Sequence, residues 1–591
     1  MKFYYKLLIG IVIFIYFEFK KINEIFNYIF KYFFNTFDLF KLLKFKFKIN
    51  EHSFKNKYIR KFLILNKKKN KNHIEPFHAK KKYILIESLI NHPIYTLSSS
   101  IIANALSKNY SLVGLIRLGD IRTKQIMKSY GIKKFITVNN SNFFLRLFYF
   151  YKSILILSKL KNFDSLIDLK IDHIEIGKTV YEHYTRFVGN YPKKINWKVI
   201  LFFSQALFYQ KKNKKILDEF KPAYLIQSEQ LFIPHRILFQ QALKSETKII
   251  CKSHVNNACV KLYKNFSERN ESRLKISKKL FVNLNKKHRK SILSKANNIY
   301  FSKKKNEHIG KELDFINKRK VFNKVDKFKK HNKTYLEKDF FNYFDLDSSK
   351  KTVLILSHEM TDGTFANSWN IFKNDQIWLE ETLKIIKKIK NINFIIKPHP
   401  SEGFYNSKVS TAKIFREYIS KKNSHIKLFP TEQNINSILR HIDIVISSHG
   451  SAGYQYPAYS IPAIICGDTS FSDLGFNIQP KNFLEYKKIL LKLNRINKLD
   501  VKIANKAKAF WFIYKNITRV KMPTIHFDDI SMNYNATNFW RKTYENLKNS
   551  KNPQNLKIKN DFEFFLKLQI KNNNSNMLNH NLLKNLKDLK F

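Results

Sequence analysis

Residues 442–453 have the sequence IDIVISSHGSAG, and this stretch carries the strongest indication of the fold. Its first part, Ile442–Ile446, is a short apolar run interrupted only by Asp443, and such runs are typical of a strand that is buried on both faces of a parallel sheet. The run passes directly into small residues and two glycines at Ser447–Gly453, and a helix start is predicted near Ser451. A strand that turns into a helix over such a loop is the repeating unit of a doubly wound α/β domain.

Two other predicted strands in this half of the chain also end in polar turns. Lys351–Leu356 (KTVLIL) precedes SHEMTDGT at 357–364, and Asn393–Ile396 (NFII) precedes KPHPSE at 397–402. Because each turn directly follows a strand, parallel packing would bring the three turns to one rim. Ligands bind open parallel sheets at this rim, outside the carboxyl ends of the strands.

The same alternation of apolar runs and helix-compatible stretches occurs earlier, at Tyr83–Ile86, Ser111–Ile116 and Lys134–Val138. A chain of 591 residues is too long for one core. The predicted fold class is therefore α/β, with two Rossmann-like doubly wound domains that face a cleft and an N-terminal, membrane-associated helical extension. The predicted boundaries are 1–80 for the extension and linker, 81–260 for the first Rossmann-like domain, 261–350 for a helical connection and hinge, 351–485 for the second Rossmann-like domain, 486–545 for C-terminal helices and 546–591 for a polar tail.

The net charge of +64, from 109 Lys and Arg against 45 Asp and Glu, suggests nucleic acid or an anionic membrane surface as a partner. Lys far outnumbers Arg, whereas base reading and bidentate phosphate recognition favour Arg. The chain also has no Arg-rich helix and no aromatic–basic strand signature, so we expect no nucleic acid. Three cysteines without a CxxC pair exclude a zinc finger and a disulfide framework, and indicate a reducing, cytoplasmic setting.

The N-terminal run Leu7–Phe17 (LLIGIVIFIYF) is slightly short for a membrane span and has no small-residue cleavage site after it. The aromatic and Lys-rich residues that follow are typical of a helix at a membrane surface, and an irregular arm is the alternative. These features predict a location at the cytoplasmic face of the inner membrane, peripheral or with a single N-terminal anchor. The apolar segment 143–160 predicts a buried helix, with a second membrane-contacting surface as the alternative, and the polar run 63–81 predicts a linker.

The polar turns carry groups that suit a phosphate ligand. Gly450 and Gly453 let a ligand approach the backbone, and Ser451 either caps the following helix or donates to a phosphate oxygen. Lys397 and His399 flank a proline that fixes the backbone, so both are predicted to act as cationic donors to a pyrophosphate. Each turn has a structural alternative, which is a simple strand-to-helix connection or a rigid Pro-containing corner.

The ordered set HEMTDGTFAN, WLEETL, NINFIIKPHPSE and IDIVISSHGSAGYQYPAYSIPAIICGDTSFSDLGF, within about 350–480, resembles the C-terminal half of bacterial capsule and surface-polysaccharide biosynthesis proteins with a GT-B glycosyltransferase fold. A weaker resemblance covers 82–255 and includes IEIGKTVYEHYTRF at 174–187. The resemblance implies a nucleotide-sugar donor in the second domain and a glycan or lipid-linked glycan acceptor on the first. The residues that it implies for donor and phosphate binding are His399, Pro400, His449, Gly450, Ser451 and Gly453.

The sequence departs from this family at three positions. Gln455 stands where the family usually has a Glu, Phe471 replaces a frequent Tyr, and Lys178 replaces a frequent acidic residue. Gln455 keeps a hydrogen-bonding group for a ribose hydroxyl but lacks the charge. We expect altered donor specificity rather than loss of activity.

A glycosyl transfer needs a base for the acceptor hydroxyl and groups that stabilise the departing diphosphate. The candidate bases are Asp362, Glu359 and Glu87, His358 joins the predicted donor site, and Arg186 is predicted to hold an anionic acceptor or to form a surface salt bridge. No metal and no bound cofactor are expected, since GT-B enzymes generally need none. The alternatives are a CDP-glycerol-type phosphotransferase, a sugar-nucleotide epimerase on the same fold, or a non-catalytic basic protein that binds membrane or RNA.

Overall fold

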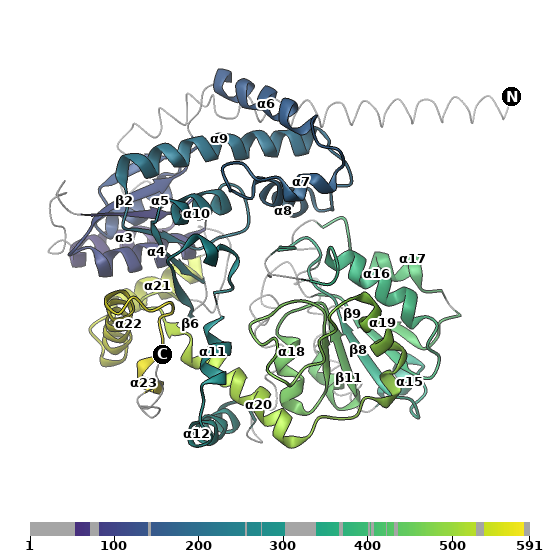
Figure 1. Cartoon of the computed structure of the whole chain (residues 1–591). Helices are drawn as coiled ribbons and strands as arrows, with labels where there is room; N and C mark the ends of the chain where they lie inside the picture. Colours follow the sequence, from purple (N-terminus) through teal and green to yellow (C-terminus); the bar gives the residue numbers. More distant parts are fainter. Residues whose placement is uncertain are drawn as a thin grey trace.

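The computed structural model describes most of the chain as two α/β domains (Figure 1). The described residues are 54–70, 82–90, 92–139, 143–253, 257–273, 275–301, 339–365, 370–399, 402, 407–420, 422–430, 435–526 and 537–583. The predictions for residues 1–53 and for Pro400 lie outside this set. Within it, every helix is too short or too polar to cross a membrane.

The first domain is built on a six-stranded sheet with β1 and β4 at its centre. All neighbouring strands are parallel except β7, which pairs antiparallel with β5 at one edge. In spatial order the strands are β3 (Lys134–Thr137), β2 (Ser111–Ile116), β1 (Tyr83–Glu87), β4 (Tyr224–Gln227), β5 (Lys248–Lys252) and β7 (Val260–Tyr263). The predicted strands are present, but β7 extends the sheet into the segment that was predicted to begin the connection.

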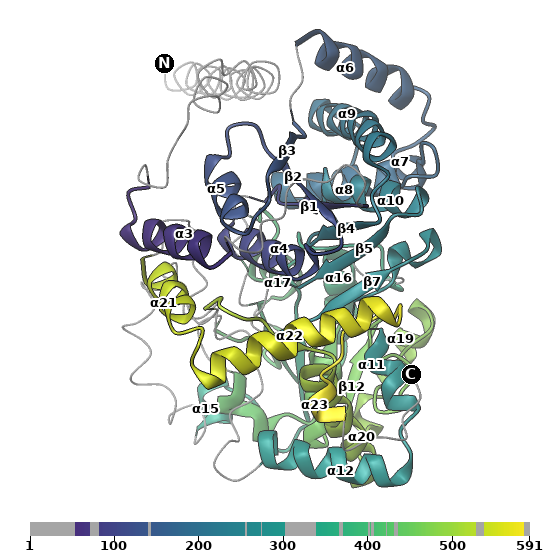
Figure 2. The same ribbon diagram turned by 90° about the vertical axis from the view of Figure 1, so that its left-hand side faces the viewer.

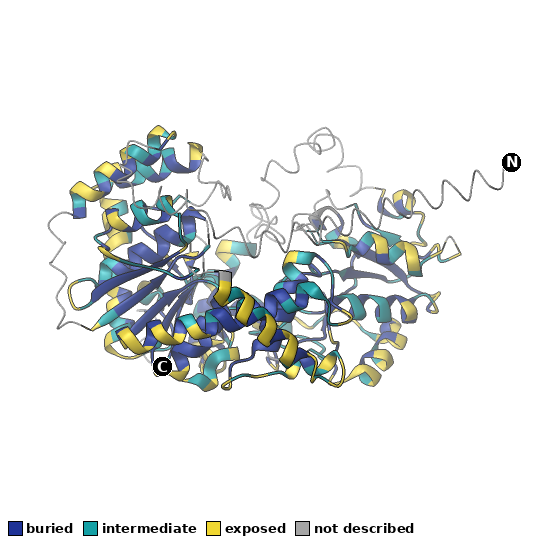
Figure 3. Ribbon diagram, turned by 90° about the horizontal axis from the view of Figure 1, so that it is seen from above, coloured by how far each residue is buried: buried dark blue, intermediate teal, exposed yellow. Residues whose placement is uncertain are grey.

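The central strands of this sheet are apolar on both faces because helices cover both sides. Leu85 and Leu225 point to one side, and Ile84 and Ile86 point to the other. One layer contains α9 (Trp197–Phe220) and α10 (His235–Lys244), and the other contains α3 (Lys57–Asn70), α4 (Pro93–Leu106), α5 (Ile121–Ser129), α21 (Thr537–Lys548) and α22 (Pro553–Lys571). Figure 3 shows that the central strands of both domains are buried, whereas the edge strands β3 and β10 (Ile426–Leu428) are partly exposed.

Two segments from the ends of the chain belong to the first domain, contrary to the prediction. The expected linker is helical as far as Asn70, and Phe62 and Leu63 of α3 are buried. The expected polar tail contains α22, in which Phe562, Phe565 and Leu566 are buried. Figure 2 shows α21 and α22, in yellow, beside α3 and α4. Apolar residues at positions i, i+3 and i+4 of a Lys-rich helix form a narrow stripe on one side. This stripe is enough to pack the helix against the domain.

The second domain has a five-stranded, fully parallel sheet. Its order is β10 (Ile426–Leu428), β9 (Asn393–Lys397), β8 (Thr352–Leu356), β11 (Ile444–Ser447) and β12 (Ala463–Ile465). The helices α16 (Asp375–Ile386), α17 (Thr411–Tyr418) and α19 (Phe483–Leu491) cover one face, and α18 (Ala452–Gln455), α20 (Val501–Phe512), α11 (Ile276–Val282) and α12 (Lys286–Ala296) form the layer on the other.

Helices α11 and α12 correct the prediction for the connection at 261–350. Phe281 and Ile292 share a hydrophobic core with Phe510 of α20. These helices are therefore part of the second domain rather than a free hinge. The chain returns to the first domain through β13 (Val520–Lys521), which pairs with β6 (Asn257–Ala258).

The apolar segment at 143–160 forms helix α6 (Phe143–Leu157), but the helix is not buried as predicted. Tyr149, Ser153 and Leu157 lie at intervals of four residues and face α9. The opposite side of α6 is exposed. A single neighbouring helix covers only one stripe of a helix that is apolar all round.

Candidate functional site

The order of the second sheet identifies a place where a ligand is expected. From β8 the chain continues to β9 and β10 on one side, whereas β11 and β12 lie on the other side. The strand order therefore reverses between β8 and β11, and ligands bind open α/β sheets outside the carboxyl ends of the strands at such a switch point. His358 follows β8, His449 follows β11, and His399 follows β9.

These three histidines form a stack with His358 in the middle. The ring centroids of His358 and His449 are 3.7 Å apart, and those of His358 and His399 are 5.6 Å apart. In each pair the two ring planes are inclined to each other by 15°. The expectation that the three turns meet at one rim is confirmed.

Local hydrogen bonds and one glycine hold the turns together. The hydroxyl of Ser447 shares its one proton between the Leu356 carbonyl at 3.1 Å and the His449 carbonyl at 2.9 Å. Gly450 has a φ of +101°, and a Cβ there would lie 3.4 Å from Nε2 of His358. The left-handed backbone is the reason for glycine at this position, since a Cβ would make only an ordinary contact with the His358 ring.

Two of the histidines, His358 and His399, have lowered pKa values and are neutral near pH 7. Burial and the neighbouring His449 lower the pKa of His358 to about 4. Burial, His358 and Lys397 lower the pKa of His399 to about 3. His399 is therefore a neutral hydrogen-bonding group rather than a cation, and its predicted contact with a phosphate stays a prediction. Lys397 is buried at the end of β9, with its Nζ 5.1 Å from the ring centre of Phe429.

Asp375, in the first turn of α16, completes the cluster. Its Oδ1 lies 3.6 Å from Nδ1 of His449, which also forms a 2.8 Å hydrogen bond with the hydroxyl of Ser448. One ligand atom from each of Asp375, His358 and His449 lies within 4.8 Å of the others, so these residues could hold a divalent cation. Sequence reasoning missed Asp375 because an acidic residue after the helix cap Asn374 is an ordinary helix start.

The turn after β11 leads into the short helix α18, which changes the roles expected for its residues. The hydroxyl of Ser451 donates to Oε1 of Gln455 at 3.4 Å and does not cap the helix. A Cβ on Gly453 would lie 2.3 Å from Phe471, so packing accounts for this glycine. A helix of four residues, Ala452–Gln455, adds little charge at its N-terminus, and any ligand there would rely on individual backbone N–H groups.

Helix α8 (Ile176–Val188) of the first domain reaches the turn after β8. Arg186 forms a 3.3 Å ion pair with Asp362, and Glu182 accepts a hydrogen bond from the backbone N–H of Phe365. The hydroxyl of Tyr191 donates to the carbonyl of Met360. These contacts connect the two domains beside the histidine stack. Arg186 forms a salt bridge, but at the contact between the domains rather than on the open surface, and its predicted role in holding an acceptor stays a prediction.

Glu182 is a notable residue that sequence reasoning did not select. Its side chain is fully buried, and burial raises its pKa to about 7 despite the hydrogen bond from Phe365 and the nearby charge of Arg236. Its Oε2 has no hydrogen-bond partner among the described residues. A spacing of four residues places Glu182 and Arg186 on the same side of α8. This spacing is the sequence feature from which Glu182 could have been selected as a site residue.

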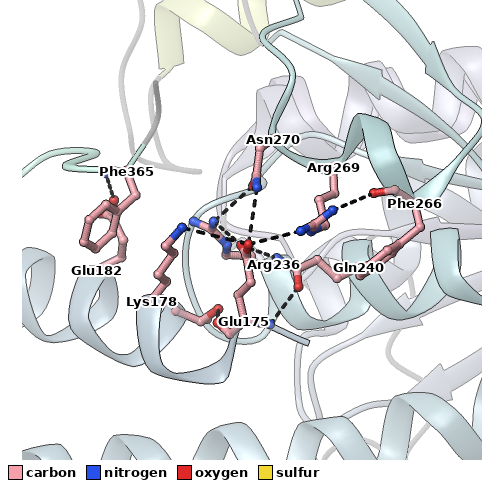
Figure 4. A network of polar contacts seen from close by, with 10 residues as sticks. Glu175, Lys178, Glu182, Arg236, Gln240, Phe266, Arg269, Asn270 and Phe365 are labelled. Atoms are coloured by element: carbon pink, nitrogen blue, oxygen red, sulfur yellow. Dashed lines mark hydrogen bonds and ion pairs between the residues drawn. The ribbon is translucent and has the colours of Figure 1, made fainter. Parts of the chain in front are cut away.

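A polar network next to Glu182 holds the start of α8 in place (Figure 4). Glu175 forms a 2.8 Å ion pair with Arg236 and accepts hydrogen bonds from Gln240 and Asn270. Burial alone would raise the pKa of Glu175, but Arg236 and the other partners lower it to about 2. The ionised Glu175 therefore fixes α8 on α10.

The three predicted bases have different environments. Burial raises the pKa of Asp362, and Arg186 partly offsets this effect. Glu359 is held within its own turn by the Thr361 hydroxyl, at 2.9 Å, and burial raises its pKa. Glu87, the third candidate base, is buried within the first domain, where its carboxylate lies 3.2 Å from Nδ1 of His235.

Together the fold and the site define a two-domain α/β protein with polar residues gathered at the carboxyl ends of both sheets. No protein-family model and no curated protein matches the chain. Similar solved structures include a glycosyltransferase from Rickettsia africae (12% identity, 80% of this chain and 100% of the other, TM-score 0.25). Others are the KpsC β-Kdo 2,4-transferase of Thermosulfurimonas dismutans (10% identity, 49% and 79%, TM-score 0.26) and the UDP-GlcNAc 2-epimerase of Neisseria meningitidis (11% identity, 73% and 98%, TM-score 0.20). At these TM-scores the likenesses carry no argument about function, and the fold class rests on the strand order of the two sheets.

Proposed function

We propose that this chain is a GT-B glycosyltransferase that moves a sugar from a nucleotide-sugar donor to a surface glycan or lipid-linked glycan at the cytoplasmic face of the membrane. The observation that carries the proposal is the stack of His358, His399 and His449 at the switch point of the second sheet. Helix α8 of the first domain contacts the turn after β8, and its side chains would face an acceptor.

The histidines suit the phosphates of a nucleotide-sugar. A neutral imidazole has one N–H that can donate to a phosphate oxygen. Nδ1 of His358 is buried and has no partner among the described residues, and a buried polar atom of this kind is normally satisfied. A diphosphate oxygen at the stack would satisfy it.

The transfer step needs a base and a stabilised leaving group. The base takes the proton of the acceptor hydroxyl, its oxygen bonds to the anomeric carbon, and the bond from that carbon to the diphosphate breaks. The nucleotide leaves with the electron pair. We assign the base role to Glu182 or Asp362, because a carboxyl whose pKa is raised toward neutrality is an effective base near pH 7. Imidazole N–H groups and Arg186 would stabilise the leaving diphosphate without a metal.

Nucleotide binding is tested by measuring the unfolding temperature of the full chain with CMP, UDP and GDP. We expect at least one nucleotide to stabilise the protein and His399→Asn to abolish the effect. The matched control is His425→Asn. His425 is buried in the same domain but lies just before β10, at the end of the sheet where the strands begin, whereas the histidine stack lies where they end. If no nucleotide changes the unfolding temperature, the basic binding protein replaces the transferase.

The reaction class is tested with a panel of nucleotide-sugars. A transferase releases nucleotide faster when a glycan acceptor is present. Conversion of the donor to its epimer without nucleotide release would assign the epimerase alternative instead. Turnover of a CDP-linked polyol alone would assign the phosphotransferase.

A further inference from the structure

We propose that helix α6 is a docking surface for an anionic lipid bilayer and lies in the plane of the membrane interface. The surface consists of the outward residues Leu147, Phe148, Tyr151, Ile154 and Leu155. The side chains of Phe148 and Tyr151 are 56% and 60% exposed. Large apolar side chains that gather on one exposed face of a helix mark an interaction site.

The geometry of α6 separates a packed side from an outward side. Tyr149 packs edge-on against Phe208 of α9, with ring centres 6.2 Å apart, and Ser153 and Leu157 continue the same side. The outward residues fall on the opposite side of a helix with 3.6 residues per turn. Figures 1 and 2 show α6 at the outer edge of the first domain, with α9 between it and the sheet. The outward side therefore points away from the described part of the domain.

Charge identifies the partner. The segment from Phe143 to Phe163 contains four basic residues and no acidic one, and Lys152, Lys159 and Lys161 are exposed. Apolar rings between lysines match a surface of anionic headgroups above acyl chains. A second copy of a chain with a net charge of +64 would place the same lysines against each other. Residues 1–53 are also Lys-rich. Charge therefore favours an anionic lipid surface over both residues 1–53 and a second copy of the chain as the partner of α6.

The length of α6 fixes its orientation. Its 15 residues are fewer than the roughly 20 that a spanning helix needs, so α6 would lie flat. Both α6 and α8 pack against α9, and helix axes in contact are about 8–10 Å apart, so α8 lies within about 20 Å of α6. If the proposed transferase function holds, this arrangement keeps the acceptor side near lipid-linked substrates, but bilayer docking itself does not depend on that function.

A fluorophore on α6 tests the contact in the full chain. We would label Tyr151→Cys with an environment-sensitive dye, which is selective because Cys251, Cys259 and Cys466 are all buried. Leu484→Cys in α19 of the second domain is the control, since Leu484 is 68% exposed. Vesicles with phosphatidylglycerol should shift the emission at 151 to shorter wavelength and raise it severalfold, with no change at 484, and pure phosphatidylcholine should have a weaker effect.

Two results would overturn the proposal. One is an unchanged signal at 151 in protein that floats with the vesicles, which would assign binding to another part of the chain. The other is an apolar signal at 151 before vesicles are added, which would show that residues 1–53 or a second copy covers α6.

A loss-of-binding experiment gives an independent readout. Changing Phe148 and Tyr151 together to Ser should weaken vesicle partitioning by about tenfold, whereas Leu484→Ser should not. Because these side chains are exposed, the unfolding temperature and its response to nucleotides should stay the same. Equal partitioning of the double variant and the native chain would contradict the proposal, while loss of the nucleotide response alone would count only against the proposed function.

Discussion

Replacing Glu182 by Gln should make the protein more stable at alkaline pH while slowing its reaction. In the unfolded chain this carboxyl titrates near the ordinary value of 4.5, whereas burial raises its pKa to about 7 in the folded protein. The folded state therefore binds the proton more tightly and loses stability as the pH rises from about 4.5 to about 7, after which the loss is constant. At about 1.4 kcal/mol for each tenfold change in acid strength, the full loss is about 3 kcal/mol.

The substitution removes this loss with little change in shape. The amide oxygen of Gln can still accept the hydrogen bond from Phe365 N–H, so the contact between the domains is kept. Unfolding should therefore require up to about 3 kcal/mol more at pH 8 and less than about 1 kcal/mol more at pH 5. The first unfolding transition of the full chain, followed at both pH values, measures this difference. Glu219→Gln, at an exposed position on α9, is the control and should change little at either pH.

The same variant tests the catalytic role. If Glu182 is the base, the stabilised Gln variant should turn over donor and acceptor at least about 100-fold more slowly, because a positioned base contributes about 10²–10⁴-fold. An equal gain in stability at both pH values would refute the raised pKa. Unchanged turnover in a variant with the expected pH dependence would leave Asp362 as the base.

Three further outcomes follow from the second domain. Gly453→Ala should lower the stability of that domain by about 1–3 kcal/mol in denaturant unfolding, because the new methyl group would overlap the buried ring of Phe471. Gly450→Ala should clearly reduce the rise in unfolding temperature that a nucleotide causes, while the unfolding temperature of the free protein should fall less. The substitution strains the left-handed turn beside His358 but leaves the core unchanged. A chelator should leave the nucleotide response unchanged, and a loss of response that zinc restores would instead assign a metal to the two histidines and Asp375.

The sequence predicted the parts of the fold that depend on short patterns. Apolar runs such as Ile442–Ile446 gave the parallel strands, and the polar turns that follow them gave the histidine stack, because parallel strands necessarily end at one edge. It did not predict β7 as an antiparallel edge strand or α22 as part of the first core. Both depend on contacts between residues far apart in the chain, which periodicity does not encode.

The same limit applies to the site. The pKa of Glu182 is raised only because α8 meets the turn after β8, and Asp375 matters only because the start of α16 lies beside His449. Before folding, each is one carboxylate on an ordinary helix. The exposure of α6 has a similar origin, since its composition alone predicts burial and only the position of α9 shows that one side is left uncovered.

The two switch points explain why the donor is expected on the second sheet. In the first sheet the order reverses between β1 and β4, and the side chains there are already paired with one another. Burial alone would raise the pKa of Glu87, but His235 and the N–H of Leu89 lower it, and Lys252 donates to the hydroxyls of Ser98 and Ser228.

A ligand at the first sheet would have to break these buried contacts, and a buried charge that loses its partner costs several kcal/mol. At the second sheet the imidazole rings beside β8 and β11 are half-buried, and Nδ1 of His358 still lacks a partner among the described residues. Binding at His358 would form a hydrogen bond without breaking a fully buried ion pair. The energetics therefore favour an anion at the second sheet, with the first domain contributing α8 from outside it.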